Sequence, residues 1–177
     1  MNKSKKFLIA QIGKTHGLNG DLKLHLHTDF PEQFKVGETF DSSLGELEIT
    51  RINPKRATVA FKGYNDIDSA KKLTNAKIYS SIEETRERCK LKEGEHFWFD
   101  LEGCNIIENG TLLGTVTEVQ RLSDTDYLYI QTSQELVKNK KLPTNFLIPK
   151  IDRFIVSVDT EKKIINTKDA KGILEAS

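Results

Sequence analysis

The sequence predicts an all-β protein made of two small β-barrels in series, with one short helix. Three observations support this fold class. Apolar and polar residues alternate at period two along most of the chain and rarely keep the 3.6-residue period of a helix. Turn residues interrupt the alternation after every few residues. A charged stretch over residues 83–95 contains few apolar residues and divides the strands into two groups.

The first half of the chain is expected to form six strands, at residues 7–12, 22–27, 39–40, 47–52, 57–61 and 77–79. In the second of them the leucines take one face, and Lys23, His25 and His27 take the other. The pair Asn19-Gly20 precedes this strand and suits a tight hairpin turn, because both central residues of such a turn adopt positive φ.

The one expected helix covers residues 66–73. Asp66 supplies a capping carboxylate, and Ile67, Ala70 and Leu73 fall on one stripe. Asn75 then supplies a stop.

The domain boundary follows from the charged stretch. The first domain is expected at residues 1–82, a linker at 83–95 and the second domain at 96–177. The second domain is expected to contain short strands at residues 96–98, 104–107, 114–120, 126–130, 147–149, 154–158 and 164–167. Strands this short and this closely spaced favour a closed or nearly closed barrel.

The two halves of the chain differ in charge. Residues 1–90 carry 16 Lys and Arg against 12 Asp and Glu, a net charge of +4, while residues 91–177 carry 11 against 14, a net charge of −3. A basic half is compatible with contact to a nucleic-acid backbone, and a chance split of the charges is the alternative. The sequence pI near 7.7 disfavours a strongly basic protein that binds RNA independently.

The sequence also indicates the cellular compartment in which the protein works. The apolar run at residues 7–12 is too short for a signal-peptide core or a membrane span. Cys89 and Cys104 form no CxxC pair, so neither a zinc site nor a disulfide scaffold is indicated. We therefore expect a cytoplasmic protein with no membrane partner.

Two apparent ligand motifs are weak. Gly13-Lys14-Thr15 resembles the end of a phosphate-binding loop, but Leu8 stands where that motif needs glycine. His16, His25 and His27 lack a carboxylate or thiolate spaced to complete a metal site, so a polar outer strand face explains them better. No metal, cofactor or small-molecule substrate is expected.

The densest aromatic patch is the run His96-Phe97-Trp98-Phe99. On a strand, Phe97 and Phe99 point one way and His96 and Trp98 the other, so one pair needs a cover other than the barrel core. The first domain, a partner protein or RNA is expected to cover that outward-facing pair. The alternative is that the aromatic residues only pack in the core or between the domains. No nucleophile is paired with a base, which favours a binding protein over an enzyme.

Several segments, in the right order, resemble one known family. The sequence IGKTHGLNGDLKL at residues 12–24, followed by TDFPEQF at residues 28–34, closely resembles the opening of the RimM family of bacterial ribosome maturation factors. FKG at residues 61–63 and the helix after it resemble a later part of the same domain. WFDLEG at 98–103, GTV at 114–116, LIP at 147–149 and FIVSVD at 154–159 resemble the family's second domain, a PRC-type barrel.

The resemblance implies a six-stranded N-terminal barrel of the translation-protein type and a C-terminal PRC barrel. It also implies a non-catalytic role in maturing the small ribosomal subunit. The implied partners are small-subunit ribosomal protein nineteen, the free small subunit and nearby small-subunit rRNA. Partner binding is expected at His96, Phe97, Trp98 and Asp100, and rRNA contact is expected at Lys14, His16, Lys23, Asp29 and Phe30.

The sequence departs from the family's pattern at a few positions. His96 and Phe97 stand where the family often has two tyrosines, Lys150 replaces a usual apolar residue, and Asn75 stands where glycine is common. The rival hypotheses are an RNA-processing or RNA-modifying enzyme whose catalytic groups are remote in sequence, and a general protein-interaction module.

Overall fold

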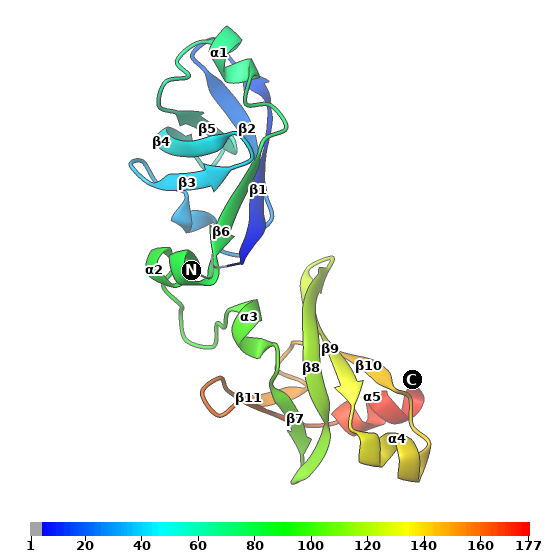
Figure 1. Cartoon of the computed structure of the whole chain (residues 1–177). Helices are drawn as coiled ribbons and strands as arrows, with labels where there is room; N and C mark the ends of the chain where they lie inside the picture. Colours follow the sequence, from blue (N-terminus) through cyan, green and yellow to red (C-terminus); the bar gives the residue numbers. More distant parts are fainter. Residues whose placement is uncertain (1–4) are drawn as a thin grey trace. The chain divides into compact units, whose positions relative to one another are not determined.

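The structure, a computed structural model, describes residues 5–177. The chain divides into two compact units, residues 1–90 and residues 91–177 (Figure 1). The division falls inside the stretch predicted to separate the domains, but that stretch is not a linker throughout. Helix α2, Ile82–Arg88, occupies its first part because Ser81 and Glu84 form a reciprocal capping box.

The first unit contains a closed barrel of six antiparallel strands. The strands follow one another around the barrel in the order β1-β2-β5-β4-β3-β6. They are β1 Lys6–His16, β2 Asp21–Leu26, β3 Thr39–Ser42, β4 Gly45–Asn53, β5 Thr58–Phe61 and β6 Lys77–Ser81. All six strands predicted for this half are confirmed, with longer bounds for most.

Inward-facing side chains fill this barrel, since alternate residues of a strand point to opposite faces. The fully buried ones include Ile9, Ile12, Leu22, Phe40, Ile49, Phe61 and Ile78. Helix α1, Ile67–Lys71, begins at Asp66, whose carboxylate accepts the Ser69 N–H at 2.8 Å. The helix buries Ala70 against the same core, and Asn75 follows with φ 71°.

The turn between β1 and β2 differs from the predicted two-residue hairpin. Strand β1 continues to His16, which pairs with Asp21, so residues 17–20 form a four-residue turn. Positive φ falls on Gly17 and Gly20, while Asn19 is absent from the described residues that have positive φ. The hairpin type predicted from Asn19-Gly20 is therefore wrong.

The second unit is built on one six-stranded sheet in the order β10-β9-β8-β7-β12-β11. Strands β12 and β7 are parallel, and every other neighbouring pair is antiparallel. The strands are β7 Asn105–Glu108, β8 Thr111–Leu122, β9 Thr125–Thr132, β10 Asn145–Pro149, β11 Ile155–Asp159 and β12 Ile164–Thr167. Two strand-rich units in series confirm the predicted fold class.

The structure holds more helices than the one predicted. Besides α1 and α2, the described residues form a 3-10 helix and three further α-helices: η1 Pro31–Gln33, α3 Trp98–Leu101, α4 Gln134–Lys140 and α5 Ala170–Ala176. The second core contains Leu101 of α3, Leu136 of α4 and Leu174 of α5. Each of these helices is short and contributes one or two apolar residues, so no long helical period marks them in the sequence.

Candidate partner-binding surfaces

The aromatic run of the second unit begins a helix and is not the predicted strand. Helix α3 starts at Trp98, directly after Phe97, and Leu101 at its end is buried in the core. Phe97 and Phe99 stack with their ring centroids 5.0 Å apart, and Trp98 meets Phe99 edge-on at 5.3 Å. Phe97 is 4% exposed and Trp98 is 38% exposed, so Trp98 is the aromatic group that the unit offers to solvent.

A lysine far along the chain holds the end of α3. The Lys163 Nζ donates to the carbonyl oxygens of Asp100 at 2.8 Å and Glu102 at 3.2 Å. The last carbonyls of a helix lack partners within it and carry partial negative charge, so an ammonium group there stabilises the helix end. This contact fixes the backbone that carries Trp98 and Asp100.

His96 lies in a mixed electrostatic environment just before this helix. Partial burial lowers the pKa of His96, the positive charge of Lys150 lowers it further, and the carboxylate of Asp100 acts in the opposite direction. His96 lies close enough to Asp100 and Lys150 to feel both charges, while Trp98 is exposed and Phe97 is buried against Phe99. Lys150 was not among the predicted site residues.

The predicted rRNA-contacting residues of the first unit fall into two places: Lys14, His16 and Lys23 lie on the β1–β2 hairpin, and Asp29 and Phe30 lie in the loop after it. Lys14 is exposed on a β-bulge, because the register of β1 against β2 shifts between Ile12 and Thr15. Gly13, in the same bulge, lies against His25: a Cβ atom at this glycine would stand 2.6 Å from the His25 Nε2. The same Cβ atom would stand 3.2 Å from the Lys23 Cβ, so the bulge that carries Lys14 lies beside Lys23 and His25 of β2.

Lys23 and His16 have internal neighbours. The Lys23 Nζ donates to the Arg56 carbonyl oxygen at 2.8 Å. His16 pairs in the ladder with Asp21, whose carboxylate accepts from Arg51 Nη2 at 2.7 Å. Lys23 thus ties β2 to the turn between β4 and β5.

Asp29 and Phe30 lie past the other end of β2, away from Lys14. Asp29 is exposed, but Phe30 is only 7% exposed and its carbonyl oxygen accepts from the Gln33 side chain at 3.1 Å. Gln33 Nε2 also donates to the Thr28 hydroxyl at 3.3 Å, which closes this loop on itself. Phe30 therefore positions the loop and offers little surface of its own.

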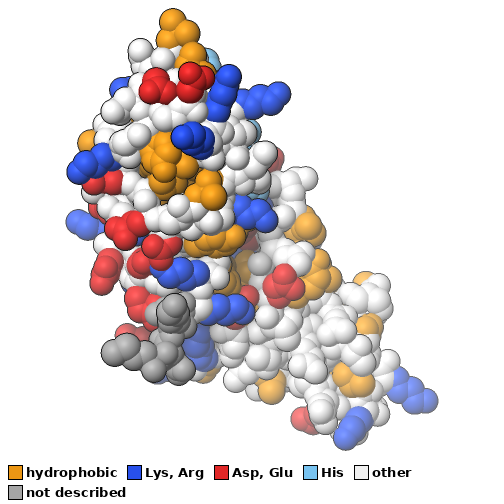
Figure 2. All heavy atoms as spheres, turned by 45° about the horizontal axis from the view of Figure 1, so that its top comes forward, with side chains coloured by type: hydrophobic (Ala, Val, Ile, Leu, Met, Phe, Trp, Pro, Cys, Tyr) orange, Lys and Arg blue, Asp and Glu red, His pale blue; other side chains and the backbone are white. Residues whose placement is uncertain are grey.

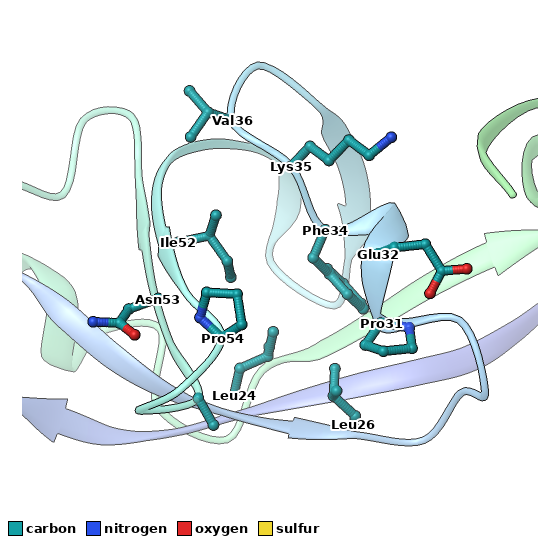
Figure 3. A pocket seen from close by; sticks show the side chains of 11 residues that line it. Leu24, Leu26, Pro31, Glu32, Phe34, Lys35, Val36, Ile52, Asn53 and Pro54 are labelled. Carbon is teal, nitrogen blue, oxygen red and sulfur yellow. The ribbon is translucent and has the colours of Figure 1, made fainter.

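A groove of about 710 Å³ opens next to this loop, and sequence reasoning missed it (Figure 3). Its lining is mainly apolar and comes from β2, the segment at residues 31–36, the end of β4 and the β4–β5 turn. The lining residues are Leu24, Leu26, Pro31, Glu32, Phe34, Lys35, Val36, Ile52, Asn53, Pro54 and Ala57. The alternation of β2 predicts Leu26 inside the barrel, whereas it is 43% exposed and lines the groove.

Within residues 5–177, no cluster of three or more His, Cys, Asp or Glu side chains is arranged to hold a metal ion. His16, His25 and His27 accordingly form no such group there. None of the described helices is both long and apolar enough to cross a membrane.

Comparison with known protein families identifies the class of protein to which both units belong. Residues 7–85 match the family described as the RimM N-terminal domain, and residues 98–173 match the family described as the RimM PRC barrel domain. The two matches fall one in each compact unit, in the order expected of a two-domain protein of this class. The chain belongs to the RimM family.

Relatives match along nearly the whole chain. A protein of Sulfurovum sp. named "Ribosome maturation factor RimM" is 56% identical over 98% of this chain and 97% of its own length. Proteins of the same name from Nitratiruptor sp. and Aliarcobacter butzleri are 50% and 48% identical, covering 98% and 100% of this chain and 99% and 100% of their own lengths. A crystal structure of a putative 16S ribosomal RNA processing protein RimM from Pseudomonas aeruginosa is 18% identical, with a TM-score of 0.40, over 94% of this chain and 99% of that one.

Proposed function

We propose that this protein is a ribosome maturation factor that binds the free small ribosomal subunit and assists assembly of its head and 16S rRNA processing without catalysing a reaction. The observation that carries the proposal is the match to relatives of that name over the full length of both units, at up to 56% identity. It needs no cofactor, and it works in the cytoplasm, where bacterial ribosomes assemble.

The opposite net charges of the two units suit different partners, a basic protein for one unit and rRNA for the other. Residues 91–177 carry a net charge of −3, which complements a basic ribosomal protein such as small-subunit protein nineteen and repels phosphate. Residues 1–90 carry +4 and take the contacts with rRNA. Within the first unit the exposed Lys14, with His16 and His25 on the same hairpin, is the leading rRNA contact. Asp29 and Phe30 contribute through the position of their loop.

The protein-binding surface of the second unit centres on Trp98. A half-exposed indole held edge-on against Phe99 offers a rigid, preorganised contact, and tryptophan is a frequent anchor of binding energy. His96 and Asp100 supply polar groups beside it, while buried Phe97 supports the stack. This surface is proposed to contact protein nineteen.

Binding to isolated protein nineteen tests the site. Trp98→Ala should weaken binding by about 2 kcal/mol, roughly thirtyfold, with an unchanged circular dichroism spectrum. Leu122→Ala, which removes a 44% exposed side chain elsewhere in the same unit, is the matched control and should leave the affinity unchanged. Unaltered affinity in folded Trp98→Ala would move the surface elsewhere.

Sucrose-gradient sedimentation and an activity assay test the rest. The protein should migrate with free small subunits and not with complete ribosomes. Purified protein alone should leave an rRNA precursor intact, and divalent-metal-dependent cleavage by the protein would favour the RNA-processing enzyme instead. A deletion strain with normal small subunits would point to the general interaction module.

A further inference from the structure

The groove of the first unit has the lining of a peptide-binding site. Leu24 and Phe34, both part of the barrel core, lie at its base, and Leu26, Ile52 and Pro54 stand around them (Figure 3). Val36 at its margin is 63% exposed. Side chains of this kind, left in water next to a concave surface, gain free energy when a partner covers them.

One strand edge in the groove lacks a partner among the described residues. The His27 N–H donates to the Ile9 carbonyl at 2.8 Å, so the peptide groups of the preceding residue, Leu26, face away from β1. On that side β2 pairs with β5 only at Leu22 and Lys23, and the Leu24 N–H then donates to the Ala57 carbonyl at 2.8 Å. Beyond Leu24 the ladder ends, so the N–H and C=O groups of Leu26, a residue that lines the groove, face the side that β5 has left.

Cations outnumber anions around the groove. Lys35 and Glu32 line it, and their charged ends point away from its apolar base (Figure 3). The β4–β5 turn, which supplies Pro54 and Ala57, carries exposed Lys55 and Arg56 between them. Figure 2 shows hydrophobic side chains gathered among lysines, arginines and acidic side chains on one face of the molecule. The exposed Asp29 lies in the loop between the lining residues Leu26 and Pro31, so three cations stand against two carboxylates, and this excess favours an acidic ligand.

We propose that this groove binds an extended segment of a partner protein that carries apolar side chains at alternate positions and carboxylates beside them. The segment pairs with the peptide groups of Leu26, inserts its apolar side chains over Leu24 and Phe34, and places its carboxylates near Lys35, Lys55 and Arg56. This is a second protein-binding site, in the unit to which rRNA contact is otherwise assigned. It does not depend on the proposed function.

The test uses the full chain and a fluorescein-labelled peptide of about seven residues, the length of one strand. The peptide has valine or leucine at alternate positions, threonine between them and glutamate at each end. Fluorescence anisotropy should show binding, and the amide resonance of Leu26 should shift in a ¹H–¹⁵N spectrum. Replacing the glutamates by lysines, or methylating the peptide nitrogens that face β2, should each weaken binding about tenfold or more.

Two variants locate the binding on the chain. Leu26→Ser should weaken binding about tenfold, whereas Leu112→Ser, at a 42% exposed strand leucine of the second unit, should leave it unchanged. The charge reversal Lys55→Glu with Arg56→Glu should also weaken it, with the groove itself intact. Absence of peptide binding, equal loss in Leu112→Ser, or displacement of the peptide by single-stranded oligouridylate, which would assign the groove to RNA, each overturns the proposal.

Discussion

The carboxylate of Glu108, at the end of β7, caps helix α5 at Ala170, whose N–H donates to Glu108 Oε1 at 2.8 Å. Glu108 Oε2 accepts the next amide, that of Lys171, at 3.2 Å. Asp169 directly precedes the helix with φ 59°, and its side chain makes no capping hydrogen bond. A residue about sixty positions away in sequence therefore does what a local cap does elsewhere, and joins two ends of the second unit.

Replacing this cap should destabilise the second unit. Glu108→Gln removes the negative charge and one of the two accepting oxygens from an 8% exposed site, so the free energy of unfolding should fall by about 1–3 kcal/mol. Trp98 is the only tryptophan in the chain, so urea unfolding followed by its fluorescence reports on this unit. Glu161→Gln, at an exposed turn, should change stability by less than about 0.5 kcal/mol, and an equal loss in both variants would contradict the capping role.

Alanine substitutions at Gly17 and Gly20, in the β1–β2 turn, should distinguish the cost of backbone strain from the cost of steric overlap. Both have positive φ, at 76° and 84°, but a Cβ atom at Gly17 meets nothing, whereas one at Gly20 would overlap the Tyr64 carbonyl oxygen. Gly17→Ala should therefore cost about 1 kcal/mol of conformational strain. Gly20→Ala should cost clearly more, because a backbone atom has to move. Thermal unfolding by circular dichroism should rank the two variants in this order, and equal midpoints would refute the steric argument.

The two cysteines should react slowly in the folded protein. Burial raises the pKa of the Cys89 thiol to about 11, with the Glu32 carboxylate adding to the effect, and burial also raises the pKa of Cys104. At pH 8 the thiolate is scarce, and each cysteine is at most 4% exposed. A disulfide reagent should label neither at a rate near that of the urea-unfolded chain. Fast labelling of the native protein at pH 8 would contradict this environment.

The raised pKa of Cys89 should also make the free energy of unfolding depend on pH in the alkaline range. Because the folded pKa of Cys89 lies above its ordinary value of 9.0, the unfolded thiol loses its proton first as pH rises. The free energy of unfolding should therefore be steady below about pH 9 and decline between about pH 9 and 11. Cys89→Ala should reduce this decline, and urea titrations at several pH values measure it.

Strands were predictable here because their signal is local. The alternation of apolar and polar residues in β2 and in the second-unit strands depends only on which face is buried. Helix α1 was predictable for the same reason, from Asp66 and one apolar stripe. Helix α2 was missed although its capping box, Ser81 with Glu84, is readable in the sequence, because the charge of the segment suggested a linker instead.

The parts that could not be predicted depend on contacts between distant residues. The sequence shows that Leu26 alternates with Leu22 and Leu24, but not that β5 stops pairing before it, so its exposure follows only from the closed barrel. Helix α3 is held by Lys163, more than sixty residues away from Asp100. Helix α5 similarly depends on Glu108. Short elements with distant caps leave no periodic trace in their own sequence.

The pKa of His96 should depend on burial first and on the charge of Lys150 second. Burial and the ammonium group of Lys150 both lower the pKa of His96, and the carboxylate of Asp100 opposes them. Lys150→Met should therefore raise the pKa of His96, and Asp100→Asn should lower it further. The ring-proton shifts of the four histidines, followed by NMR against pH and assigned with His96→Gln, give the values.

The sign of the accompanying stability change follows from the direction of the shift. A histidine whose folded pKa lies below its ordinary value of 6.5 binds a proton more readily in the unfolded chain. His96 therefore leaves the free energy of unfolding unaffected well above pH 6.5 and lowers it as pH falls through that value. Lys150→Met should make this loss smaller, while Lys162→Met, at an exposed turn, should not change it. If the His96 pKa were the same with and without Lys150, the neighbouring charge would not act on this residue, and burial alone would account for its low pKa.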